Sequence, residues 1–363
     1  MSLNTISTIQ QLIEALQFYF HVTITDDDQQ VVFDEKMQFL HLDHIQSMYD
    51  TSRFHKVHIR GTTPVFELPE TNLTTTRTMV LEGVTSLGRL AFDNCTALTS
   101  ITLPNGLTSI GQEAFYNCTS LTTIHLPSTL SSIGLWAFRD CNALTSIELP
   151  ESLTSIGESA FRDCNALASI DLPESLTSIP EEMFQYCNAL TSIELPESLE
   201  SIGQHAFYKC TALASIDLSH TQVASIGPWA FVECTSLASI ELPESLESIG
   251  RDAFNYCEAL QSIELPASLE SIGRDAFYGC TSLQSIELPD SLESIGELAF
   301  QSCTALQSIT IHYTGGNLSI GSNPFDNCTA LTSITINYTG AKPTTFATAF
   351  PETKRELINY VLM

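Results

Sequence analysis

The sequence predicts a solenoid, a fold in which one short unit is copied along an axis, and two observations lead to it. All eleven cysteines recur at steps of 23 residues, apart from one step of 24 and one of 25. A phenylalanine also stands three residues before each cysteine, as Phe138 does before Cys141. A fixed period of this size is typical of repeat proteins whose neighbouring units stack on one another.

The repeat from Cys141 to Asp163 begins with a strand. Ile147 and Leu149 alternate with Ser146 and Glu148, which is the period-2 pattern of a strand with one buried face. The proline that follows Leu149 lacks an N–H and turns the chain. When coils stack, these strands are expected to join into a parallel sheet.

The second half of the repeat returns the chain to its start. Residues 153–156 are predicted to form a second short extended piece, and Gly157 releases the backbone for the next corner. Residues 158–163 are predicted to form a single helical or 3-10 turn, with Ala160 and Phe161 pointing inward.

The cysteines are predicted to be free, buried thiols in a stacked file. Equivalent Cα atoms of adjacent coils lie within disulfide range, but their Cβ vectors run parallel, and an odd number cannot pair completely. A metal array needs ligands clustered at short spacing, whereas each coil supplies one cysteine. Free thiols agree with a reducing compartment.

The run L-x-S-I-x-L-P-x-S-L-x-S-I-G-x-x-A-F-x-x-C, repeated over about residues 77–337, resembles the BspA-like leucine-rich repeat family. The resemblance implies a right-handed solenoid with a parallel sheet on one face, and we expect the short helical or 3-10 turns on the other. It also implies binding of other macromolecules, commonly at a cell surface or host interface, without catalytic residues. Most family members are exported, whereas no secretory signal is visible at this N-terminus.

Three regions are predicted along the chain: residues 1–72 as an N-terminal α+β cap or module, 73–337 as about eleven coils, and 338–363 as a C-terminal cap or tail. The first region is expected to hold a helix near residues 6–20, a hairpin, a second helix at 37–48 and a strand at 56–59. The hairpin strands are Val22–Thr25 and Val31–Phe33. The tail has a helix start and an apolar end, with an export signal as the alternative to a cap.

The repeat departs from its pattern in three places. Residues 217–223 add one residue and residues 312–317 add two, while Pro180 replaces the corner glycine. The single added residue is expected to make a small bulge in one corner.

The net charge of −28 belongs to a chain in which only 15% of residues are charged. Surface charge of one sign should repel nucleic acid and anionic membranes and attract basic partners. No run approaches the roughly 18 apolar residues that a bilayer span needs. The expected location is the cytoplasm, or a host cell reached through a specialised secretion system, with the cell surface as the alternative.

One outward position of the predicted strand is acidic in seven successive coils, and we call this file the acidic strip. Its members are Glu148, Asp171, Glu194, Asp217, Glu241, Glu264 and Glu287. Like charges one strand apart repel, so a negatively charged surface for a basic protein or peptide is the functional interpretation. The alternative is that duplication copied one solvated acid, with solubility as the benefit.

Aromatic residues are a second candidate surface, because Trp136 and Trp229 precede the Ala-Phe pair of their coils. They could anchor an interface or pack between corners. No nucleophile elbow, phosphate loop or HExxH motif is present, so we expect no catalytic residues, cofactor or metal. The sequence therefore predicts a non-enzymatic binding scaffold that acts as a bacterial effector or host-interaction protein, and it leaves the oligomeric state open. The alternatives are a surface adhesin and an enzyme with its active site in residues 1–72.

Overall fold

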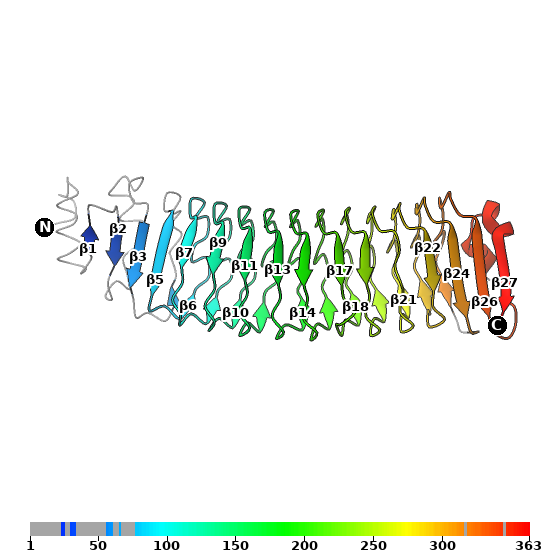
Figure 1. Ribbon diagram of the computed structural model, residues 1–363, viewed down its shortest axis with the longest axis horizontal. Coiled ribbons are helices and arrows are strands. Elements are labelled where there is room, and N and C mark those ends of the chain that lie inside the picture. Colours follow the sequence, from blue (N-terminus) through cyan, green and yellow to red (C-terminus); the bar gives the residue numbers. More distant parts are fainter. Residues whose placement is uncertain are drawn as a thin grey trace. The chain divides into compact units, whose positions relative to one another are not determined.

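The computed structural model describes residues 23–25, 30–33, 56–60, 65–66, 77–315, 318–343 and 346–363 (Figure 1). The chain divides into two units, residues 1–173 and 174–363. Each unit is a stack of coils, and most coils contribute one strand to each of two parallel ladders. In Figure 1 the strands of one ladder, such as β7, β9 and β11, point opposite to those of the other, such as β6 and β10.

In the first unit the strands of both ladders are two to five residues long. The first ladder and its N-terminal extension contain β1 (Thr23–Thr25), β2 (Gln30–Phe33), β3 (Lys56–Arg60), β5 (Thr78–Glu82), β7 (Ser100–Thr102), β9 (Thr123–His125), β11 (Ser146–Glu148) and β13 (Ser169–Asp171). The second ladder contains β4 (Val65–Phe66), β6 (Ser86–Leu87), β8 (Ser109–Ile110), β10 (Ser132–Ile133) and β12 (Ser155–Ile156).

In the second unit the strands of the first ladder become longer toward the C-terminus. Its strands are β15 (Ser192–Glu194), β17 (Ser215–Asp217), β19 (Ser239–Glu241), β22 (Ser285–Leu288), β24 (Ser308–Tyr313), β26 (Ser333–Tyr338) and β27 (Ile358–Leu362). The second ladder contains β14 (Ser178–Ile179), β16 (Ser201–Ile202), β18 (Ser225–Ile226), β20 (Ser248–Ile249), β21 (Ser271–Ile272), β23 (Ser294–Ile295) and β25 (Ser319–Ile320). Two 3-10 helices, η3 (Phe346–Ala349) and η4 (Glu352–Leu357), precede β27.

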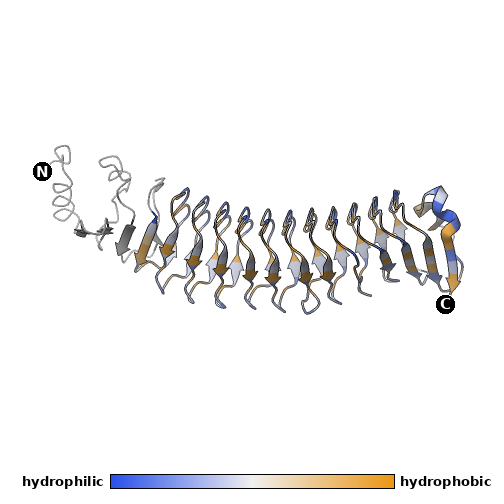
Figure 2. Ribbon diagram, turned by 45° about the horizontal axis from the view of Figure 1, so that its top comes forward, coloured by the Kyte–Doolittle hydropathy of each residue, from blue (hydrophilic) through white to orange (hydrophobic). Residues whose placement is uncertain are grey.

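Strand register places identical residues side by side. Ser132 pairs with Ser155 and Ile133 with Ile156 in the first unit, and Ser271 pairs with Ser294 in the second. The apolar residues consequently recur at the same place in one coil after another (Figure 2). This confirms the predicted strand at residues 146–148, and the second extended piece, predicted at 153–156, contains the strand β12 at residues 155–156.

The N-terminal strands agree with part of the sequence prediction. β1 and β2 pair antiparallel, as expected for the hairpin, and the strand predicted at 56–59 is β3. β3 pairs in parallel with β5, and β4 pairs in parallel with β6, so both ladders reach back to these strands. The helices predicted at 6–20 and 37–48 lie outside the described residues, and the boundary at residue 72 stays a prediction.

The six residues before each cysteine, which we call the turn segment, make the i to i−3 hydrogen bonds of 3-10 turns. Arg139 N–H donates to the carbonyl of Trp136 at 3.2 Å, while Trp136 N–H donates to Glu158 in the next coil at 3.0 Å. Hydrogen bonds within the turn segment thus alternate with hydrogen bonds to the next coil. This pattern requires a positive φ at two positions per coil, for example 57° at Trp136 and 62° at Asp140. A continuous helix cannot form because left-handed residues interrupt it.

The core is a file of phenylalanines beside a file of cysteines. Within each unit, ring centroids of successive Phe residues lie 4.9–5.5 Å apart with interplanar angles of 1–19°. All eleven cysteines are buried and free, as predicted. The Cys141 thiol donates to the carbonyl of Phe115 in the preceding coil at 3.2 Å, so the thiol serves as a small buried donor.

The three departures from the repeat leave the register intact. The residue added at 217–223 is taken up in a turn where Thr221 N–H donates to Leu218 at 2.9 Å, and Ser225 pairs with Ser201 afterwards. Ahead of the second insertion, β24 extends to six residues. The carbonyl of Pro180 accepts from Met183 N–H at 3.3 Å, as the corner carbonyl of Gly203 does from the alanine three residues later.

The C-terminal tail covers the last coil of the second unit. β27 pairs in parallel with β26, and the ring of Phe350 stacks on Phe325 with centroids 4.9 Å apart. Phe346 is buried. The predicted helix start is the 3-10 helix η4, and the apolar end forms a strand. These contacts support a cap, the role we propose for residues 338–363.

Replacing a corner glycine by alanine should destabilise the protein, because adjacent coils approach too closely there for a side chain. A Cβ added at Gly134 would lie 2.6 Å from Gln112 N and 2.7 Å from Gly111 C, both backbone atoms. We expect Gly134→Ala to lower the free energy of unfolding by about 1–3 kcal/mol, measured by thermal and urea unfolding. Gly106→Ala is the control, since a Cβ there meets nothing within 4 Å. Equal effects of both changes would contradict the explanation.

Stability should fall in alkaline solution because burial raises the pKa of the thiols, to about 12 for Cys280 and Cys328. Above about pH 9 the unfolded chain loses thiol protons that the folded chain keeps. The unfolded state then binds fewer protons, so stability is complete below about pH 9 and declines toward pH 12. Urea unfolding in the presence of a reductant, repeated between about pH 9 and pH 12, measures this decline in the free energy of unfolding. Cys280→Ala should reduce the slope by up to about 1.4 kcal/mol per pH unit, and an unchanged slope would contradict the assignment.

Candidate functional site

In the second unit, the acidic strip lies on the outward face of the first ladder. β17 and β19 each show an exposed, buried, exposed pattern over Ser-Ile-acid. Asp217 lies directly opposite Glu241 in the strand register. Glu194 and Glu287 are exposed on β15 and β22, while Glu264 is exposed at the same repeat position in a coil whose residues 261–266 form no strand. Because the central isoleucine fills the core, the acid has to face solvent.

In the first unit, the strip contributes Glu148 and Asp171, and both side chains are exposed. Glu148 lies opposite His125 of β9 in the register. The strand predictions at these positions are confirmed. Use of the acidic strip for binding remains a prediction.

Asp217 differs from the other strip members because the inserted turn holds its carboxylate. Ser219 donates to Asp217 Oδ1 from its backbone N–H at 2.8 Å and from its hydroxyl at 2.6 Å. His220 Nδ1 lies 3.8 Å from the same oxygen. The Ser219 hydrogen bonds, followed by the nearby imidazole, hold the pKa of Asp217 below its usual value. This acid therefore shapes the corner in addition to facing solvent.

Glu287 marks the C-terminal end of the strip. His312 Nε2 lies 2.6 Å from Glu287 Oε1, and Glu287 pairs in register with Thr310 on β24. The two residues border a shallow hollow whose walls also include Pro289, Asp290 and Met363. The acidic strip therefore ends at Glu287, whose carboxylate has the imidazole of His312 as a hydrogen-bond partner.

Further acids extend the negative surface beyond the strip. Glu200, Glu247, Glu270 and Glu293 form a partial file along the second ladder, as the sequence predicts, and all four are exposed. The corners between the two ladders add other exposed acids, including Glu197 and Glu244. Most coils of the second unit consequently carry acids on the strands and the corner between them.

Between residues 89 and 328, the lysines and arginines are confined to the turn segments. Between residues 89 and 328 the chain has six lysines and arginines, and all of them lie within the six residues before a cysteine. Each contacts a carboxylate, at distances of 2.9–3.5 Å; they are Arg89, Arg139, Arg162, Lys209, Arg251 and Arg274. In the described chain between residues 89 and 328, these six cations therefore contact acids of the turn segments and no acid of the strands.

The tryptophans pack along the turn segments. The ring of Trp229 stacks on His205 with centroids 5.1 Å apart, and the Arg251 guanidinium lies 5.3 Å from the Trp229 ring centroid. Trp136 has the same kind of contact with Arg139, also at 5.3 Å. Each Trp is half-buried. These contacts favour the interpretation that the tryptophans pack between corners.

The structure also brings together Glu181, Glu182 and His205, a group that the sequence interpretation missed. One ligand atom from each lies within 4.8 Å of the other two. The signal was present, since Glu182 and His205 both stand five residues before a cysteine and are 23 residues apart. The repeat period places such residues in adjacent coils.

Within the described part of the chain, no helix combines the length and the apolar character that crossing a membrane requires.

Comparisons with solved structures find leucine-rich repeat proteins. A solved leucine-rich repeat protein from Bacteroides ovatus is 25% identical, with a TM-score of 0.54 and coverage of 94% of this chain and 97% of its own. A leucine-rich cell surface protein from Faecalibacterium prausnitzii is 27% identical, with a TM-score of 0.44 and coverage of 88% and 93%. The pneumococcal vaccine antigen PcpA is 22% identical, with a TM-score of 0.48 and coverage of 85% and 79%. A comparison with curated proteins gives no match.

The model of the BspA type leucine rich repeat region matches residues 70–190, 154–263 and 247–354. These ranges include every cysteine and every member of the acidic strip. The chain therefore belongs to the BspA-type leucine-rich repeat family.

Proposed function

We propose that the protein is a non-enzymatic binding scaffold whose acidic strip engages a basic protein or peptide. A leucine-rich repeat scaffold is typical of bacterial surface and protein-interaction proteins, and the family match supports this general role. The specific surface is argued from the distribution of charge in the second unit.

The observation that carries the proposal is the separation of charge between strands and turns. In several coils an acid of the turn segment contacts an arginine or lysine, as Asp252 contacts Arg251 at 3.0 Å. Strip members such as Glu241 and Glu264 are exposed on coils whose lysines and arginines all lie in the turn segments. Between residues 89 and 328 no lysine or arginine lies on a strand, whereas a surface that serves solubility alone commonly mixes charges of both signs.

The spacing of the strip allows its charges to act together. Neighbouring strands lie about 4.8 Å apart, which is shorter than the Debye length of about 8 Å at physiological ionic strength. The potentials of adjacent carboxylates consequently add, and a partner's cation reduces their mutual repulsion. Binding should accelerate at low salt and weaken as salt rises.

The proposed setting is a host-interaction role in a reducing interior, in the cytoplasm or in a host cell after translocation. The eleven buried free thiols support this setting, because cysteines in an oxidising compartment are commonly paired.

Protein isolated from its native source without reductant should therefore release eleven titratable thiols per chain after denaturation. Thiol labelling followed by intact-mass measurement checks the number. A lower count accompanied by disulfide-linked peptides would contradict the reducing setting.

Reversing three charges of the acidic strip should weaken capture of the partner. The variant Glu194→Lys/Glu241→Lys/Glu264→Lys is compared with the natural chain in pull-downs from the native source, followed by titration of the recovered partner. Each exposed ion pair contributes about 0.2–1 kcal/mol, so the loss of three pairs should weaken binding by about 3- to 150-fold.

The matched control reverses three exposed acids outside the strip, in Glu158→Lys/Glu258→Lys/Glu356→Lys. It changes the net charge by the same amount and should retain the partner. Equal partner recovery by the strip variant and the natural chain would remove the strip from the mechanism. Equal loss in both variants would show that net charge alone attracts the partner.

A further inference from the structure

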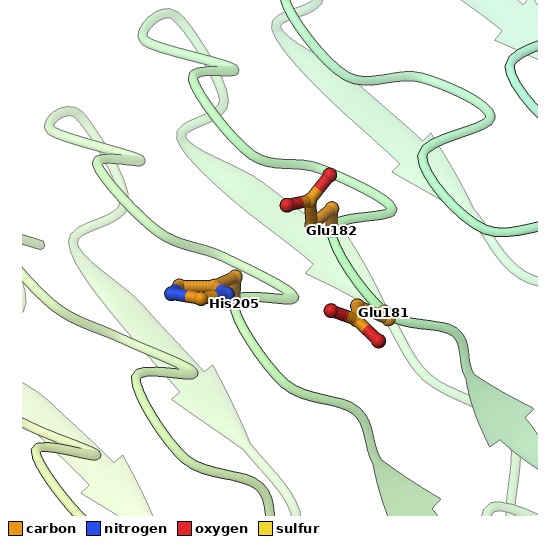
Figure 3. Close-up of side chains that lie close together, drawn as sticks. All are labelled: Glu181, Glu182 and His205. Atoms are coloured by element: carbon orange, nitrogen blue, oxygen red, sulfur yellow. The ribbon is translucent and has the colours of Figure 1, made fainter.

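Three side chains that could ligate a metal ion meet on the turn segments of the second unit. Glu181 and Glu182 follow one another in one coil, and His205 lies in the next coil (Figure 3). One ligand atom from each lies within 4.8 Å of the other two. Glu181 is exposed, while Glu182 and His205 are half-buried, so an ion could reach them from solvent.

The backbone holds the two coils together at this point. Glu182 N–H donates to the carbonyl of Gln204 at 2.9 Å, and His205 N–H donates to Pro228 at 3.0 Å. Both Glu182 and His205 have positive φ, 56° and 54°, as the corresponding residue has in every coil from Leu90 to Asn323. Their Cα atoms are therefore fixed by the repeat itself.

The imidazole of His205 is held by its aromatic neighbours. It stacks on Trp229 with centroids 5.1 Å apart and an interplanar angle of 13°. The ring of Tyr208 meets it edge-on at 5.5 Å. A ligand whose orientation is already fixed loses little conformational freedom when an ion binds.

A donor group already lies between two of the three ligands. The side-chain nitrogen of Gln204 lies 3.0 Å from Glu181 Oε1 and 3.2 Å from His205 Nδ1. Glu181 Oε1 and His205 Nδ1 therefore both lie within hydrogen-bond distance of one point in space. A metal ion could take that place after the Gln204 side chain swings away.

The local sequence distinguishes this coil from its neighbours. In two later coils an arginine stands immediately before the acid at the position of Glu182, giving the pairs Arg251–Asp252 at 3.0 Å and Arg274–Asp275 at 2.9 Å. Here that preceding residue is a second carboxylate, Glu181. A divalent cation would offset the repulsion between the adjacent carboxylates.

We propose that Glu181, Glu182 and His205 bind one divalent transition-metal ion, with Zn²⁺ as the representative. Two carboxylate oxygens and one imidazole nitrogen are ligands that Zn²⁺ accepts, with water completing a tetrahedral site. Ca²⁺ takes six to eight oxygen ligands and is a poorer match. The site is separate from the acidic strip, and its existence does not depend on the proposed partner.

Calorimetric titration of the reduced full chain with Zn²⁺, in excess Mg²⁺ to occupy diffuse acidic surface, tests the proposal. The natural chain should bind one equivalent more tightly than any further ions. His205→Ala and Glu181→Gln/Glu182→Gln should each weaken this site by about tenfold or more, since loss of an outer-shell group alone commonly costs 10–100-fold. Circular dichroism verifies that each variant is folded.

Two controls separate ligation from general effects. Glu244→Gln/Glu247→Gln removes the same charge from exposed acids of another coil and should leave the affinity unchanged. Gln204→Ala removes the bridging amide and should keep or increase the affinity, whereas a purely structural role for the cluster predicts a loss. No tight equivalent, the same affinity in every variant, or a Gln204→Ala loss equal to that of His205→Ala would overturn the proposal.

Discussion

The close approach of successive coils is the constraint on which the rest of the structure depends. Parallel ladders hold equivalent residues side by side, as Ser132 and Ser155 show, and at the corners even a methyl group on Gly134 would meet backbone of the preceding coil. Every other regularity follows from that separation. Phenylalanine rings stack, thiols reach the carbonyl of the coil before, and acids at one sequence position become a continuous charged surface within each unit.

This constraint also explains how charge is organised. A residue placed on a strand is repeated beside its own copies, so identical charges accumulate there without partners from the same coil. The turn segment bends more sharply and brings different residues together, which allows Arg251 to meet Asp252 and Trp229 to cover His205. The same repeat thus produces a surface of one sign on the strands and locally neutralised pairs on the turns.

The sequence predicts the elements that follow from periodicity. Ile147 between Ser146 and Glu148 specifies a strand, a buried side and an exposed acid, and the structure has all three. The positive φ of Trp136 could not be foreseen, because a bulky residue rarely adopts that conformation and the hydrogen bond to the next coil imposes it, whereas aspartate, as at Asp140, tolerates it more readily. The bridging position of Gln204 was equally hidden, since it depends on side-chain rotamers. The cluster of Glu181, Glu182 and His205 was accessible from the period alone, had each turn position been compared between neighbours.

The uniform contact between coils has an evolutionary consequence. Since each coil presents to its successor the same surface that it received from its predecessor, an in-frame duplication or deletion of one 23-residue unit leaves every remaining junction unchanged. The length of the recognition surface can then differ between strains by whole repeat units, without any new contact between coils. Selection on a lineage of such genes would act on copy number as readily as on individual codons.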